Sequence, residues 1–173
     1  MLRNAARFAS GFAIGIALWS WWAPQYNRAI LPAARQLARF DSRLIDLHYT
    51  VTGRAVDFWG GTLPPGRFPM DLLTYNLILL TALFALNRPF FARRNMIALP
   101  LSLASLVVTH IVAAAISIIA TYATRSGEWS TAHYSPFEQD LWMALEYVYR
   151  LAGMFAVAFA LWWGFQPGGE NAT

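Results

Sequence analysis

The residues most able to do chemistry in this sequence are polar side chains that interrupt long apolar runs. Glu146 and Arg150 stand four residues apart in one run, with the acid first, so they can pair along one helix face. His110 and Asn76 each lie in a different apolar run. Counting about 1.5 Å per residue from the ends of these runs, we expect all four residues in the outer half of a membrane, where they could converge.

Such a cluster has two interpretations. Ionisable side chains are costly in hydrocarbon and commonly face a bundle interior or a water-filled cavity, which favours a substrate pocket, a proton relay or a partner contact. Alternatively, Glu146 and Arg150 neutralise each other, while Asn76 and His110 tie neighbouring helices together. The spacing is compatible with both interpretations.

Motifs of catalytic and cofactor sites are absent from the sequence. It contains no Cys, which excludes a thiol nucleophile, a thiolate metal site and a disulfide. No second His or carboxylate follows His110 at ligand spacing, so we expect no metal site. Neither a G-x-S-x-G elbow nor a phosphate-binding Gly-rich loop is present. We therefore predict no catalytic residue, no cofactor and no enzymatic activity.

Two stripes of small residues indicate close packing between helices. Gly11 and Gly15 form a G-x-x-x-G pattern in the first apolar run. The last run carries a second stripe at four-residue intervals, formed by Ala152, Ala156, Ala160 and Gly164. We expect both stripes to pack against helices of the same chain, with contact to another protein as the alternative.

The composition indicates a membrane as the environment of these residues. Of the 173 residues, 57% are hydrophobic and only 13% are charged, too few to cover a water-soluble globule. This excludes a cytosolic enzyme, a disordered tail and a secreted disulfide module. The net charge is +4, but the arginines are scattered among apolar runs instead of forming one basic face, so we expect no nucleic-acid partner.

Four apolar runs approach the length of about 20 residues that crosses a bilayer core. Arginines near the N-terminus and in the connection between the second and third runs favour cytoplasmic termini by the positive-inside rule. Six arginines in the first long loop count against this orientation, although long loops follow the rule less strictly. We predict one integral membrane domain over residues 1–173, with spans at about 5–23, 71–87, 96–121 and 141–165.

The loop over residues 24–70 is too long for a simple connector, so we expect it to have its own structure. In its first half, apolar residues recur at helical intervals from Ile30 to Ala38 while arginines occupy another face, which indicates an amphipathic helix lying in the membrane interface. Further on, apolar and polar residues alternate on both sides of Gly53, which predicts a short β-hairpin.

The predicted fold is therefore that of an all-α membrane protein. A four-helix transmembrane bundle carries an extracytoplasmic loop that contains the amphipathic helix and the short β-hairpin.

The order of these parts resembles that of the exosortase H-associated membrane proteins, small bacterial proteins paired with an exosortase-type sorting enzyme. The likeness lies in a Trp-rich first span ending at Ala23-Pro24, a strand-like stretch around Tyr49 to Phe58, and a Tyr75-Asn76 entry into the second span. It also includes an acid-led fourth span, LEYVYRLAGMFAVAFALWW. The resemblance implies an accessory role in a bacterial inner membrane. Exosortases use a Cys, which this chain lacks, so no catalytic residue carries over.

We accordingly expect a non-enzymatic, multi-pass inner-membrane accessory protein that assists an exosortase-type protein-sorting system. Its expected partners are membrane lipids and a membrane protein of the exosortase type. The alternative is a small transporter or lipid-handling membrane protein with a polar cavity around Glu146, Arg150 and His110.

Overall fold

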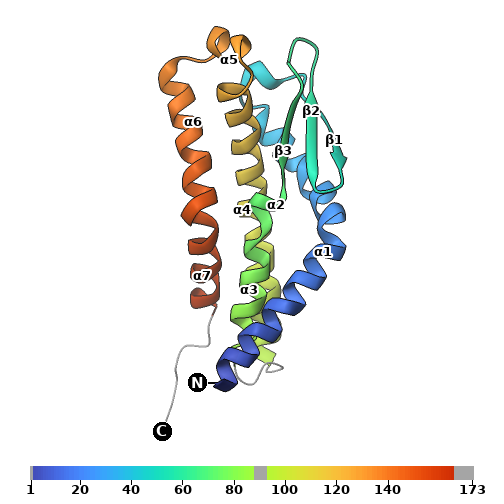
Figure 1. The fold of residues 1–173 in the computed structure, drawn as a ribbon, viewed down its shortest axis with the longest axis vertical. Coiled ribbons are helices and arrows are strands. Elements are labelled where there is room, and N and C mark those ends of the chain that lie inside the picture. The colour runs from blue at the N-terminus through green and yellow to red at the C-terminus, as the bar shows by residue number, and fades with distance from the viewer. Residues whose placement is uncertain (1, 88–92, 166–173) are drawn as a thin grey trace. The chain divides into compact units, whose positions relative to one another are not determined.

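A computed structural model describes residues 2–87 and 93–165 of the chain. The described chain is mostly helical, with a small three-stranded antiparallel sheet (Figure 1). It divides into two compact units. Unit 1 comprises Met1–Trp21, Tyr75–Val108 and Met154–Thr173, and unit 2 comprises Trp22–Thr74 and Thr109–Gly153. The two units are described separately below.

The chain begins with helix α1, Leu2–Ala38, which continues through Pro24 and Pro32. The predicted boundary between a first span and a separate interfacial helix at residues 23–24 is therefore wrong. Proline removes a backbone hydrogen bond and usually ends or kinks a helix. Here one face of α1 is buried at helical intervals along its length, from Gly11 to Ala38, and this packing offsets the lost hydrogen bonds.

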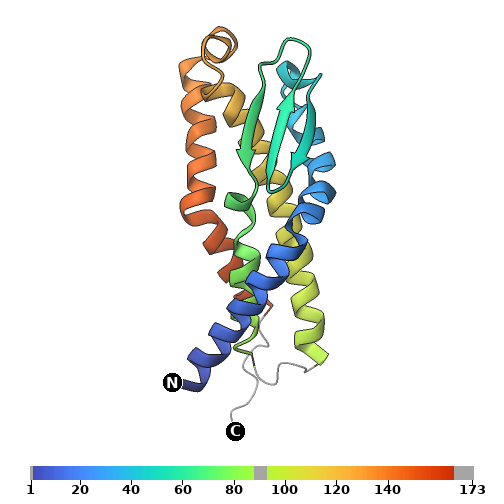
Figure 2. The ribbon, with the colours of Figure 1, turned by 45° about the vertical axis from the view of Figure 1, so that its right-hand side comes forward.

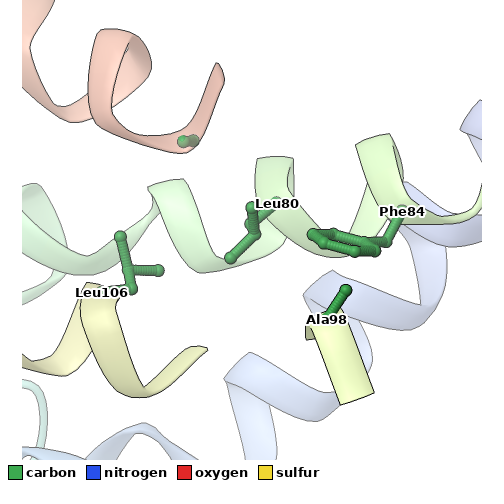
Figure 3. Packing of buried hydrophobic residues seen from close by; sticks show 5 residues of the cluster. Leu80, Phe84, Ala98 and Leu106 are labelled. Carbon is green, nitrogen blue, oxygen red and sulfur yellow. The ribbon is translucent and has the colours of Figure 1, made fainter. Parts of the chain in front are cut away.

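The regular elements of unit 1, among the residues that the structure describes, are all helices. Besides the first part of α1, the unit holds α3 (Asn76–Phe84), the first part of α4 (Arg93–Thr124) and α7 (Met154–Gly164). Leu80 and Phe84 of α3 pack in one cluster with Ala98 and Leu106 of α4, and Ala158 of α7 completes it (Figure 3). Each of these five side chains is at least 95% buried.

Unit 2 contains the sheet. Strands β1 (His48–Thr52), β2 (Ala55–Trp59) and β3 (Gly66–Pro69) are antiparallel neighbours in chain order, as Figure 2 shows. β1 and β2 form the predicted hairpin, with Val51 opposite Val56, and the turn between them holds Gly53 at a φ of 64°. A positive φ is readily adopted by glycine, which fits a tight hairpin turn.

The apolar face of this sheet packs on α4. The ring of Phe58 lies 5.7 Å from that of Phe68 and 5.5 Å from that of Tyr122 on α4, measured between centroids. Gly66 stands opposite Phe58 in the sheet, and a Cβ atom at Gly66 would overlap the Phe58 ring. The third strand therefore depends on a residue without a side chain at that position.

Five further elements of the described chain belong to unit 2, besides its parts of α1 and α4. They are the 3₁₀ turn η1 (Ser42–Leu44), α2 (Asp71–Thr74), α5 (Glu128–His133), α6 (Pro136–Val148) and the π-helical turn η2 (Tyr149–Gly153). The start of α6 has a capping box, in which Ser135 and Glu138 satisfy each other's backbone N–H groups.

Two helical stretches of the described chain are long and apolar enough to cross a membrane. They are Asn95–Thr124, of 30 residues, and Pro136–Gly164, of 29 residues. By length and composition alone, they support a membrane location, and they contain the third and most of the fourth predicted spans. The apolar stretch Asp71–Phe84 is shorter, and within it α2 and α3 are separate helices.

Candidate functional site: a buried carboxylate between two arginines

Glu146 lies at the centre of a charged cluster in unit 2. It is a residue of α6, and only 1% of its surface is exposed. Arg150 Nη2 lies 2.6 Å from Glu146 Oε1, four residues along the chain, as the sequence spacing predicts. A second arginine, Arg125, follows the end of α4, and its Nη2 lies 2.5 Å from Glu146 Oε2.

The cluster holds two guanidinium groups and one carboxylate, so its formal charge is positive. Arg125 remains 38% exposed at its side chain, whereas Arg150 is 17% exposed. The Arg150–Glu146 contact has the distance of an ion pair but not the direction of a hydrogen bond. Nη2 and Nε of Arg150 are thus both buried without a hydrogen-bond acceptor among the described residues. The Glu146 carboxylate therefore contacts two guanidinium groups. One of them, that of Arg150, keeps two buried nitrogen atoms without a hydrogen-bond acceptor in the part of the chain that the structure describes.

Arg150 is carried by the π-helical turn η2, Tyr149–Gly153. π turns inside α-helices are rare overall, and those that occur are often found at functional sites. The Tyr149 hydroxyl donates a hydrogen bond to the Leu73 carbonyl oxygen at 3.3 Å, which connects the turn to α2. The π-helical turn beside Glu146 is therefore held to α2 by the Tyr149 hydrogen bond.

His110 forms a different pair in unit 2. It is fully buried on α4, and its Nδ1 lies 2.5 Å from the Tyr26 hydroxyl on α1. The two rings meet edge to face, with centroids 5.7 Å apart. The neighbouring Asn27 is also fully buried, and its side-chain amide has no hydrogen-bond partner within residues 2–87 and 93–165. One polar pair, Tyr26 and His110, thus joins α1 to α4 in this unit.

Asn76 belongs to unit 1, at the start of α3. It is fully buried, and its Nδ2 donates a hydrogen bond to the Met154 carbonyl oxygen of α7 at 3.2 Å. Of the four residues predicted to converge, the structure brings Glu146 and Arg150 into contact, places His110 with Tyr26, and assigns Asn76 to the other unit.

The two small-residue stripes have different surroundings. A Cβ atom on Gly11 would lie 2.5 Å from Ala85 Cβ, and one on Gly15 would lie 3.1 Å from Ile78 Cα, so both glycines are closely packed on the segment that contains α3. The second stripe is exposed at all four positions, Ala152, Ala156, Ala160 and Gly164. A Cβ atom on Gly164 would meet nothing within 4 Å.

A second polar cluster of unit 2 surrounds Arg43 of η1. Its guanidinium donates to Asp41 Oδ1 and Glu138 Oε1, each at 2.8 Å, and stacks 3.8 Å above the centre of the Tyr134 ring. Burial disfavours the charged form of Arg43, but its hydrogen bonds to Glu138 and Asp41 outweigh this and raise its pKa. Burial, aided by a hydrogen bond to Asp41, also raises the pKa of Tyr134.

Sequence reasoning missed Arg125, Tyr26 and the Arg43 cluster as partners. Arg125 is 21 residues from Glu146 and Tyr26 is 84 residues from His110, so no local spacing connects them. One signal was readable: Ser135 and Glu138 have the spacing of a capping box, which fixes the start of α6.

The described residues contain no group of three or more His, Cys, Asp or Glu side chains that could hold a metal ion. Comparison of the chain with protein-family models, with curated proteins and with solved structures finds no match in any of the three.

Proposed function

We propose that this protein is a non-enzymatic, multi-pass accessory protein of a bacterial inner membrane, which binds a membrane enzyme of the exosortase type. In this proposal the chain crosses the membrane at the four predicted spans, with both termini in the cytoplasm. The two long apolar helical stretches support the membrane location, and the resemblance in layout supports the class of partner.

The observation that most supports a protein partner is the exposed face of small residues on α7. Gly11 and Gly15 are closely packed inside the chain, whereas Ala156, Ala160 and Gly164 are exposed. In a membrane, small residues allow helices to approach closely and exchange van der Waals contacts with another protein. Phe155, Phe159 and Trp163 on the same helix are 44%, 50% and 74% exposed, so large apolar side chains are available beside the small ones.

The charged cluster also favours a binding role over transport. The Glu146 carboxylate contacts Arg125 and Arg150, and these contacts compensate its buried charge inside the chain. Removing one partner of such a buried pair leaves an uncompensated charge, so we expect the intact cluster to be needed for the folded state of the unit that contains the sheet. The transporter or lipid-handling alternative depends on the same cluster, since its excess positive charge and the partly exposed Arg125 would suit an anionic substrate.

The test is co-purification from the native membrane in mild detergent, comparing wild type with Ala160→Leu. We expect a stoichiometric Cys-dependent membrane enzyme with wild type and its loss with Ala160→Leu, because the larger side chain separates the two helices. Ala144→Leu is the matched control, since Ala144 is an exposed alanine on α6 outside the stripe. A wild-type protein without this enzyme, or equal recovery with Ala160→Leu, would contradict the proposal.

A further inference from the structure

A groove of about 530 Å³ lies in unit 1 between the first turns of α1 and the segment that follows α3. Arg3 and Arg7 line it, one helical turn apart on the same face of α1. Among residues 2–87 and 93–165, no acidic residue lines the groove, and neither arginine forms an ion pair. The groove therefore carries positive charge that the described part of the chain does not compensate.

The remaining surface of the groove is largely apolar. Ala6 and Ile14 line it from α1, and Ala85 lines it from the opposite side. Gly11 brings the two sides together, because its missing side chain admits the close approach of Ala85. A polar anion alone would leave this apolar surface unused.

On the side of the groove opposite α1, the polar residue Asn87 is held in place by two hydrogen bonds. Asn87 lines the groove, and its Oδ1 accepts a hydrogen bond from Trp162 Nε1 at 3.2 Å. Its Nδ2 donates to Asn95 Oδ1 at 3.3 Å. Both contacts lie within unit 1, so α4 and α7 hold the Asn87 side chain of the groove in place.

We propose that this groove binds an anionic phospholipid of the cytoplasmic leaflet. Its phosphate is held by Arg3 and Arg7, and an acyl chain lies along Ala6 and Ile14. Guanidinium groups bind phosphate through paired hydrogen bonds. The two arginines repel the ammonium group of a zwitterionic lipid, which favours a headgroup such as glycerol. Basic pockets between helices on the cytoplasmic side are typical lipid sites. The inference rests on the proposed membrane location and orientation but not on the proposed enzyme partner.

Native mass spectrometry of the detergent-purified full chain tests this proposal. Phosphatidylglycerol and phosphatidylcholine with the same acyl chains are added in parallel. We expect phosphatidylglycerol to bind preferentially. The double variant Arg3→Gln/Arg7→Gln should weaken its binding about tenfold or more, because the lipid phosphate loses the charged hydrogen bonds that the two guanidinium groups donate. The matched control Arg28→Gln/Arg67→Gln removes two exposed arginines of unit 2 and should leave binding unchanged.

A second pair of variants tests the apolar part of the site. Ala6→Trp fills the groove without changing charge and should also weaken phosphatidylglycerol binding, whereas Ala5→Trp, on a neighbouring exposed residue that does not line the groove, should not. Equal binding of the two lipids, unchanged binding by the double variant, or displacement by inorganic phosphate as effectively as by lipid would overturn the lipid site. Extraction of the wild type from membranes by alkaline carbonate would overturn both this inference and the proposed membrane location. Resistance to carbonate without lipid binding would overturn the inference alone.

Discussion

Arg125 and Glu146 connect the end of α4 to the last turn of α6 through a hydrogen bond of 2.5 Å between Nη2 and Oε2. In the chain, α5 and most of α6 lie between the two residues. A second, longer contact of 3.4 Å joins Arg125 Nη1 to Glu146 Oε1, and Nη1 also lies 3.5 Å from the Thr121 hydroxyl. This fork joins α4 to α6 in unit 2 through the same carboxylate that Arg150 contacts.

Replacing Glu146 by Gln should destabilise the protein severely. The change removes the one carboxylate that compensates two arginines, of which Arg150 is mostly buried. Breaking a buried pair by removing one partner costs about 3 kcal/mol or more. Thermal unfolding in detergent, followed by tryptophan fluorescence, measures the loss, with the exposed Glu128→Gln as control. A stable Glu146→Gln protein that has lost transport of an anionic substrate would instead favour the transporter alternative.

Replacing the two arginines should have unequal single and combined effects. Either Arg125→Gln or Arg150→Gln leaves Glu146 with one guanidinium partner, so we expect each to cost less than Glu146→Gln. The double variant leaves a buried carboxylate alone. A double-mutant cycle on the free energy of unfolding should therefore show a coupling of about 1 kcal/mol or more between the two sites. Additive effects would mean that the arginines do not share the carboxylate.

Removing the Tyr26 hydroxyl should destabilise the interface of α1 with α4 in unit 2. Tyr26→Phe keeps the ring contact with His110 but leaves the buried Nδ1 without this hydrogen bond, at a cost of about 1–2 kcal/mol. Tyr49→Phe, on the edge strand β1, provides the matched control and should change the unfolding temperature little. Equal unfolding temperatures for Tyr26→Phe and wild type would show that the pair contributes nothing to stability.

The two small-residue stripes should respond differently to an added methyl group. Gly11→Ala places a Cβ atom 2.5 Å from Ala85 Cβ, so α1 must move away from α3, with an expected cost of about 1–3 kcal/mol. Gly164→Ala meets nothing within 4 Å and should leave the unfolding temperature of the isolated protein unchanged. If Gly164→Ala destabilised the isolated protein as much as Gly11→Ala, the exposed stripe would have a role in folding.

Local patterns predicted some elements of the fold well. The four-residue spacing of Glu146 and Arg150 predicted their contact, and alternation around Gly53 predicted the pairing of β1 with β2. Strand β3 was missed because Pro64 and Pro65 precede it and Pro69 is its last residue, and prolines usually interrupt a sheet. β3 is an edge strand, where an unpaired side tolerates proline.

Long-range relationships were not predictable from spacing. The continuity of α1 depends on the packing of its buried face, which outweighs the interruption that Pro24 predicts. Arg125 is an ordinary charged residue after an apolar run, and only the course of the chain through α5 brings it to Glu146. Asn76 was assigned to this cluster from its depth along a helix, which does not tell which face a residue occupies, and the spacing gave no sign of its hydrogen bond to the Met154 carbonyl oxygen.

Glu138 performs two tasks with one carboxylate. Its Oε2 accepts the Ser135 backbone N–H at the start of α6, while its Oε1 accepts Arg43 of η1. Fraying of the first turn of α6 therefore withdraws the partner of Arg43, and displacement of η1 removes a cation from the helix start. We therefore expect the two segments, 95 residues apart at this contact, to open cooperatively instead of independently.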